Sequence, residues 1–340
     1  MKRRPHGGYP LYPASNHYDP IRRRFFNPEP KRRLQPLDFG GAFKMLSRKG
    51  RFPAQPLPFA KPDFAAFMRQ EGLPENEQKA RFVWFGHSTL LMRVAGLNII
   101  TDPVFGMSAA PNNKMFRRFQ PPPAAPHELP PLDIILYSHN HYDHLEESFV
   151  RSVADSGVHF LVPLGMEVLL RRWGVKAENI SAADWYQSHT VGGVTFTPAR
   201  HDSSRNLADH NRMLWAGWAI EGGGQRLYFS GDSSYGSHFA DIGRHFGGFD
   251  LAFMENGQYD RRWPDNHMFP GQTVQAAIDV GARRMMPIHW GAFSLAMHDW
   301  DEPVRRSIPL AIERGLPVLT PLIGQVFDAD TETELWWEEV

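Results

Sequence analysis

Residues 137–145, YSHNHYDHL, crowd four titratable side chains into six positions, namely His139, His141, Asp143 and His144. Histidines packed this closely would repel one another when protonated. A bound cation reverses that penalty, because it binds neutral imidazole and ionised carboxylate. On an extended or turning segment, side chains two apart point the same way. His139 and His141 can therefore converge on one point, while Asp143 and His144 reach a second point beside it.

Three further titratable residues stand directly after other apolar runs. His201 follows VTFTPAR, Asp232 follows RLYFSG and His289 follows RRMMPI. If these runs are strands, their ends can meet at one edge of a sheet, where ligands bind in open α/β proteins. Zinc takes three or four nitrogen or oxygen ligands. The combined set of five histidines and two aspartates therefore predicts a site for two metal ions.

The composition limits the chemistry and the setting of this site. The chain has 340 residues, no cysteine and a formal net charge of zero. Without cysteine, disulfides and thiolate metal ligands are excluded. The beginning, MKRRPHGGYPLYP, lacks the apolar stretch of a signal peptide, and no apolar run reaches the length of a membrane span. We therefore expect a cytoplasmic protein.

The zero net charge hides a basic N-terminal part. Residues 1–62 contain 14 Lys or Arg against 3 Asp or Glu. Such an arm can wrap over the acidic remainder of the chain, contact anionic lipid on the inner membrane face, or bind nucleic acid. Peripheral contact with an anionic membrane stays open, no nucleic-acid partner is expected, and self-association is left undecided.

The elements that must position the site alternate between strands and helices, which predicts an α/β layered domain. Strands are expected at RFVWFG, as a hairpin in STLLMRVAGLNIITDP, at PLDIILYSH and HFLVPLG, in the runs before His201 and Asp232, in FDLAFMENG, and in the run before His289. Helices are expected near 38–49, 61–72, 145–157, 166–174 and 270–281. We divide the chain into residues 1–75, a Pro/Arg-rich arm with short helices packing on the main domain, and residues 76–340, the main domain.

The motif HNHYDH has the H-x-H-x-D-H pattern of the metallo-β-lactamase superfamily. Within it, VWFGHSTLLM, ITDPVF, TPARH, SGDSSYG and PIHWGAFSLAMHDWDEP make the chain similar to the N-acyl-phosphatidylethanolamine-hydrolysing phospholipase D group and its bacterial relatives. The resemblance implies an αββα sandwich with two zinc ions, although Mn²⁺ or Fe²⁺ suits the same donors. It places His139, His141 and His201 on one ion. It places Asp143, His144 and His289 on the other, with Asp232 as a bridge.

The resemblance also implies a reaction. A hydroxide held between the two metals would attack a phosphodiester, with a phospholipid-like molecule as the candidate substrate, without a serine or cysteine nucleophile. The alternatives are a lactonase or other carboxylic ester hydrolase, and, from another class, a membrane- or nucleic-acid-binding module that uses the arm. The candidate catalytic residues are Asp143, Asp232 and His267.

Other residues are expected around the metal site. Asp102 is a candidate to orient a ligand histidine by accepting its second N–H. His87 is a candidate to support a ligand or bind substrate. Candidates for the rim are Tyr235, Gln258 and Tyr259, whereas Trp290 is expected to pack in the core.

Overall fold

The computed structural model describes residues 9–32, 49–69, 72, 74, 78–112, 115–189, 193–206 and 208–340. The helix expected near residues 38–49 lies almost wholly outside these ranges. The other expected helices are found as short elements, α2 (Phe64–Met68), α3 (Glu147–Val153), α4 (Glu167–Arg172) and α6 (Pro270–Asp279).

The first large sheet has seven strands in the order β15-β3-β4-β5-β6-β7-β8. Its strands are β3 (Arg81–Trp84), β4 (Leu90–Val94), β5 (Leu97–Thr101), β6 (Ile134–Leu136), β7 (His159–Pro163), β8 (Ile180–Ala183) and β15 (Val326–Phe327). Strands β5 to β8 run parallel, so their carboxyl ends lie at one edge of the sheet.

The second large sheet has six strands in the order β14-β13-β12-β11-β10-β9. Its strands are β9 (Ser188–His189), β10 (Val194–Thr197), β11 (Gly217–Gly222), β12 (Gln225–Phe229), β13 (Leu251–Glu255) and β14 (Met285–Ile288). Strands β12, β13 and β14 are parallel. The strand β11 was not assigned from the sequence.

The central strands of the first sheet are mostly apolar, and both of their faces are buried. Successive side chains of a strand point to opposite faces. Accordingly Leu90 and Met92 of β4 enter the cluster between the two sheets, whereas Leu91 enters a second cluster under α3 and α4. Fully burying one such side chain contributes about 1.5–3 kcal/mol. The apolar run that precedes the histidine cluster, β6, is buried in the same way.

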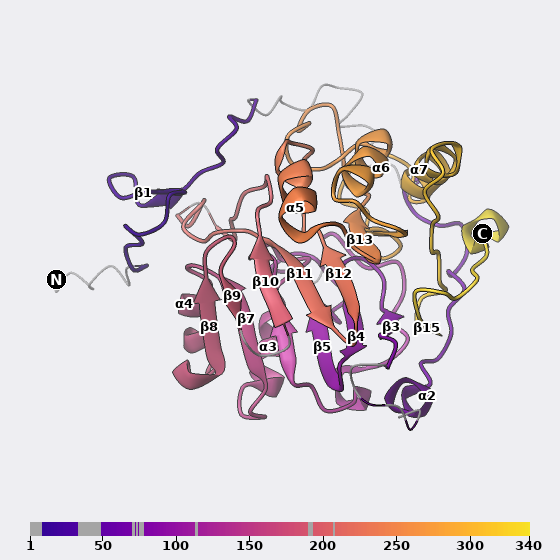
Figure 1. Cartoon of the computed structure of the whole chain (residues 1–340), viewed down its shortest axis with the longest axis horizontal. Helices are drawn as coiled ribbons and strands as arrows, with labels where there is room; N and C mark the ends of the chain where they lie inside the picture. Colours follow the sequence, from indigo (N-terminus) through magenta and orange to yellow (C-terminus); the bar gives the residue numbers. More distant parts are fainter. Residues whose placement is uncertain are drawn as a thin grey trace.

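Helices cover the outer faces of both sheets. The second sheet packs its outer face against α5 (His238–Phe246), α6 and α7 (Glu302–Glu313). Figure 1 shows these three helices, in orange to yellow, grouped on the side of the molecule away from α3 and α4. The order helix, sheet, sheet, helix is the αββα sandwich that was expected.

Glycine and proline residues mark the turn of the predicted hairpin and the ends of the predicted helix α6. Ala95 and Gly96 join β4 to β5 with positive φ angles of 47° and 80°, the conformation that two-residue hairpin turns prefer. Helix α6 begins at Pro270, and Gly281 follows it with a φ of 73°. In contrast, α7 continues through Pro309, a residue that usually ends a helix, and it was not predicted.

The described part of the arm, residues 9–32, contacts the sandwich. It forms a two-stranded ribbon of β1 (Tyr18–Asp19) and β2 (Arg24–Phe25). Tyr18 and Phe25 are buried in the central core, and the Tyr12 hydroxyl donates to Glu167. Short 3₁₀ turns lie at Pro126–Glu128, Ala177–Asn179 and Trp336–Glu339. Within the described residues, every helix is too short or too polar to cross a membrane.

Candidate metal centre

The opening cluster lies on the loop between β6 and α3, as the sequence predicted. Strand β6 ends at Leu136, and the histidines follow within the next few residues. His139 and His144 are buried, and His141 keeps 24% of its side chain exposed. The loop therefore holds these imidazoles inside the protein at the carboxyl end of a parallel strand.

The distant strand-end residues meet this loop at Asp232, which follows β12. Asp232 Oδ2 lies 3.1 Å from His144 Nε2 and 3.8 Å from both His139 Nε2 and His201 Nε2. Asp232 Oδ1 lies 3.1 Å from His289 Nδ1. One carboxylate is thus central to four of the predicted ligand histidines, which come from both sheets.

One group of donors consists of three histidines. His141 Nδ1 lies 2.9 Å from His139 Nε2 and 3.3 Å from His201 Nε2. Ligand atoms of this trio all lie within 4.8 Å of one another, close enough to share an ion. The structure therefore brings together the three residues that the resemblance placed on one metal.

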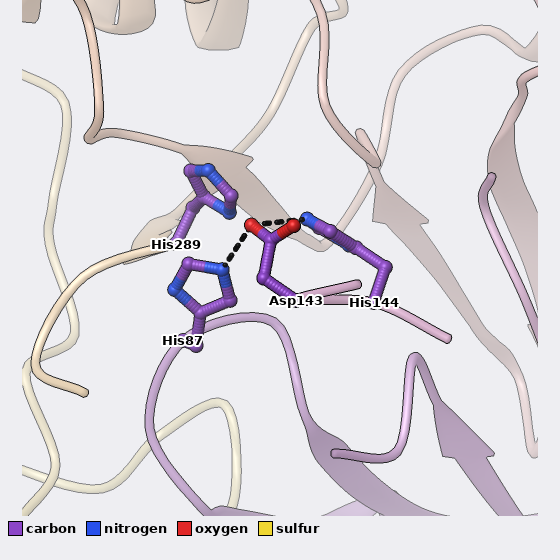
Figure 2. Close-up of side chains that lie close together, drawn as sticks. All are labelled: His87, Asp143, His144 and His289. Carbon is purple, nitrogen blue, oxygen red and sulfur yellow. Dashed lines mark hydrogen bonds and ion pairs between the residues drawn. The ribbon is translucent and has the colours of Figure 1, made fainter. Parts of the chain in front are cut away.

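The second group contains Asp143, His144, His289 and, in addition, His87. Figure 2 shows Asp143 between His87 and His144, with His289 beside them. His87 Nε2 donates to Asp143 Oδ2 over 2.9 Å, and the centroids of the His87 and His289 rings lie 4.0 Å apart with the rings tilted by 39°. His87, expected near the site, is thus within reach of the same ion as the predicted ligands.

Each predicted ligand histidine has one ring nitrogen next to a polar partner outside the donor groups, which helps to fix the orientation of the ring. The partners are Asp102 Oδ2 for His144 Nδ1 (2.7 Å), Asn266 O for His201 Nδ1 (2.9 Å), Ser138 Oγ for His139 Nδ1 (2.9 Å), Asp202 Oδ1 for His141 Nε2 (3.4 Å) and Ser88 Oγ for His289 Nδ1 (3.1 Å). The expectation for Asp102 agrees with this arrangement. Asp102 also accepts from the Ser138 N–H at 2.7 Å.

Several donor atoms that face the centre are buried without a hydrogen bond. They include His144 Nε2, His289 Nε2 and Asp232 Oδ1. Buried polar atoms are normally satisfied, so each of these needs a partner of another kind. Imidazole nitrogens and carboxylate oxygens at such spacing are the ligands that zinc accepts. The residues present therefore fit a metal centre.

The electrostatics of the cluster agree with this fit. Burial and the neighbouring His144 hold the pKa of His139 well below its usual value, so the imidazole is neutral. Burial alone would raise the pKa of Asp232, but the charges of His144 and His289 hold it well below its usual value. Burial opposes a charge on His144 too, yet Asp232 and Asp143 raise its pKa well above the usual value. The two carboxylates thus favour a positive charge beside them.

A cavity of about 270 Å³ opens onto the two groups and supplies room for a substrate. Its lining includes His141, Asp143, Asp232, Gln258, Trp263 and His267. Gln258 thus lies at the rim, as expected. Tyr235 and Tyr259 do not line it, because their hydroxyls donate to Asp279 and Glu302 instead. Trp290 is buried and stacks on Trp336, so it packs in the core as predicted.

Two carboxylates of the centre were missed by the sequence analysis. Glu255 ends β13, is fully buried and accepts a hydrogen bond from His267 Nδ1 over 2.8 Å. Burial raises the pKa of Glu255 to about 7. Burial opposes a charge on His267, but the hydrogen bond to Glu255 and its charge raise the pKa of His267. The other missed carboxylate is Asp202. For Glu255 the sequence held a usable signal, namely a charged residue at the end of the apolar run LAFME.

An αββα sandwich with clustered histidines and aspartates at the strand ends defines a class of metal-dependent hydrolases. The sequence model described as the beta-lactamase superfamily domain matches residues 97–290. The chain therefore belongs to the beta-lactamase superfamily. The chain is 40% identical over 294 residues to an uncharacterized protein of Mycobacterium tuberculosis, covering 84% of this chain and 77% of the relative.

Two further similarities bear on the function and the fold. The chain is 34% identical over 232 residues to N-acyl-phosphatidylethanolamine-hydrolyzing phospholipase D 1 of Caenorhabditis elegans, covering 64% of this chain and 65% of the relative. A solved structure described as a possible metal-dependent hydrolase from Veillonella parvula superposes with a TM-score of 0.60 at 14% identity, covering 74% of this chain and all of that one. The second match shows the fold alone.

Proposed function

We propose that this protein is a dinuclear zinc-dependent phosphodiesterase that acts on a phospholipid-like substrate. The gathering of His139, His141, Asp143, His144, His201, Asp232 and His289 at one edge of the sandwich supports the two metals. The similarity to a phospholipase D supports the assignment of a phosphodiester as the bond that is cleaved. Bound divalent cations would supply Lewis acidity and activate water for attack at neutral pH.

The residues of the chain divide the remaining work between them. Asp232 is shared by both groups of donors and holds them in register. His267 lines the cavity, and its Nδ1 is occupied by Glu255, which leaves Nε2 to exchange a proton with the substrate. Because Glu255 raises the pKa of His267, the imidazole can carry the proton that the leaving oxygen needs.

An activity screen joined to metal analysis tests the proposal. Purified protein should contain about two zinc ions per chain. It should cleave aryl phosphodiesters and N-acyl phospholipids faster than a panel of lactones and carboxylic esters. A preference for lactones would contradict the phosphodiesterase assignment. Full activity of the metal-free protein would refute the metal-dependent mechanism altogether.

The arm supplies a surface suited to an anionic membrane, and we include peripheral contact with it in the proposal. Ile21 is 93% exposed in the turn between β1 and β2, and Arg22, Arg23 and Arg24 next to it are exposed. An apolar tip among cationic side chains inserts at anionic headgroups. Cosedimentation with phosphatidylglycerol vesicles should fall strongly in Ile21→Asp. Equal binding of the wild type and Ile21→Asp to these vesicles would refute the proposed membrane contact.

A further inference from the structure

The end of the N-terminal arm lies against the loops that carry the metal-site residues. Asn27 Nδ2 donates to the backbone carbonyl of His201 over 2.8 Å. The Arg32 backbone N–H donates to Asp265 Oδ2 over 2.6 Å, and its guanidinium contacts the same carboxylate at 3.1 Å. Residues distant in sequence are thus joined beside a predicted metal ligand.

Lys31 makes the contacts that matter most for this arrangement. Its ammonium Nζ donates to Asp202 Oδ2 over 2.9 Å and to Asn266 Oδ1 over 3.0 Å. Only 19% of the side chain is exposed. A charge-assisted hydrogen bond in a partly buried setting is stronger than the exposed ion pairs elsewhere on the arm.

The two partners of Lys31 are also the partners of two ligand histidines. Asp202 places its other oxygen, Oδ1, 3.4 Å from His141 Nε2. Asn266 accepts from His201 Nδ1 over 2.9 Å through its backbone carbonyl. One ammonium group therefore holds both residues that orient the rings of His141 and His201.

We infer that Lys31 is a positioning residue for the metal group of His139, His141 and His201, and that it acts through Asp202 and Asn266. The ammonium keeps Asp202 Oδ2 occupied, so that Oδ1 remains next to His141. Without Lys31, this carboxylate is free to turn toward solvent or toward the metal. The inference rests on the metal centre of the proposed function but not on the identity of the substrate.

Partners that orient a ligand histidine affect metal affinity by about 10- to 100-fold. The test compares zinc binding by Lys31→Met, Asp202→Ala and the double variant. Lys61→Met is the matched control, because Lys61 is 80% exposed and pairs with Glu128 only at 3.9 Å. Metal-free proteins are titrated with zinc against a chelator, without substrate. Thermal unfolding of each metal-free protein measures any general loss of stability.

We expect one zinc equivalent to bind about tenfold more weakly in Lys31→Met, while the other equivalent changes less. If Lys31 acts mainly through Asp202, the double variant should bind zinc within about twofold of Asp202→Ala, because the two effects are not additive. Lys31→Gln gives the same comparison with a smaller change in packing, should Lys31→Met fold poorly. Lys61→Met should match the wild type.

Wild-type affinity in both Lys31 variants would overturn the role of Lys31, and fully additive effects with Asp202→Ala would overturn its action through Asp202. If both zinc equivalents bind equally more weakly and the unfolding temperature falls, Lys31 only stabilises the fold, and this result would overturn its positioning role too. Failure of the wild-type protein to bind zinc would overturn the metal centre itself, which is a different result.

Discussion

Replacing Asp102 by asparagine should weaken metal binding while leaving the fold in place. The two side chains have nearly the same volume, and Asn Oδ1 can still accept from the Ser138 N–H. At the position of Oδ2, however, an amide N–H would face His144 Nδ1, which now donates to Asp102 over 2.7 Å. The imidazole must then carry its proton on Nε2, the nitrogen that faces the metal centre.

The size of the effect follows from the loss of one buried acceptor. Leaving a buried donor unsatisfied costs about 1–3 kcal/mol. Since about 1.4 kcal/mol is a factor of ten, the expected loss of zinc affinity is roughly 5- to 150-fold. This range agrees with the loss of about 10- to 100-fold that follows removal of the residues behind metal ligands.

Zinc titration of the metal-free protein against a chelator measures this loss. Asp133→Asn is a matched control, because Asp133 precedes β6 at its other end and accepts from the Asn98 N–H over 2.7 Å, a bond that an amide oxygen can keep. The control should bind zinc like the wild type. The reasoning is refuted if folded Asp102→Asn retains wild-type affinity, or loses no more affinity than Asp133→Asn.

Three further changes probe other parts of the centre. Asp232→Ala removes the carboxylate shared by both donor groups, so bound zinc and hydrolysis should both fall to background while circular dichroism stays unchanged. Glu255→Gln removes the negative charge that raises the pKa of His267, while the amide oxygen can still accept from His267 Nδ1, so the alkaline limb of the kcat profile should move to lower pH. The loss in kcat should reach about 100-fold for alkyl phosphodiesters and be smaller for aryl ones, whose leaving groups need no proton; equal losses would contradict the role of His267. Burial lowers the pKa of His238 from 6.5 to about 3. Below pH 6.5 the unfolded chain therefore binds a proton that the folded chain does not bind, and the free energy of unfolding decreases as the pH is lowered. Between pH 7 and pH 5 the wild type should lose about 2 kcal/mol more unfolding free energy than His238→Asn, as measured by urea denaturation.

The gathering of the candidate metal ligands could be predicted because each follows an apolar strand, and because HNHYDH is dense enough to stand out alone. Most of the residues that hydrogen-bond to these ligands could not be predicted. Asp202 is a single carboxylate whose contact with Lys31 spans 171 positions, and no local spacing connects the two. The role of Asn266 toward His201 uses a backbone carbonyl, which every residue has.

The fold was predictable where local signals agree with the tertiary structure. Ala95 and Gly96 mark the hairpin, and Pro270 and Gly281 mark α6. Prediction failed where burial overrides local preference. Strand β11 lies between β10 and β12 although it ends in glycine, and α7 tolerates Pro309 because tertiary packing holds the helix.

The ligands of the metal centre come from both sheets, and this affects how a newly made chain matures. His139 follows a strand of the first sheet, whereas His289 follows the last strand of the second. A ribosome would release strands β3 to β8 of the first sheet long before His289 has been translated, and only the edge strand β15 follows it. A metal ion cannot therefore guide the early steps of folding with its full set of ligands. A metal held by the donor group that contains His289 would have to bind after synthesis has passed β14, whereas His139, His141 and His201 are all translated earlier.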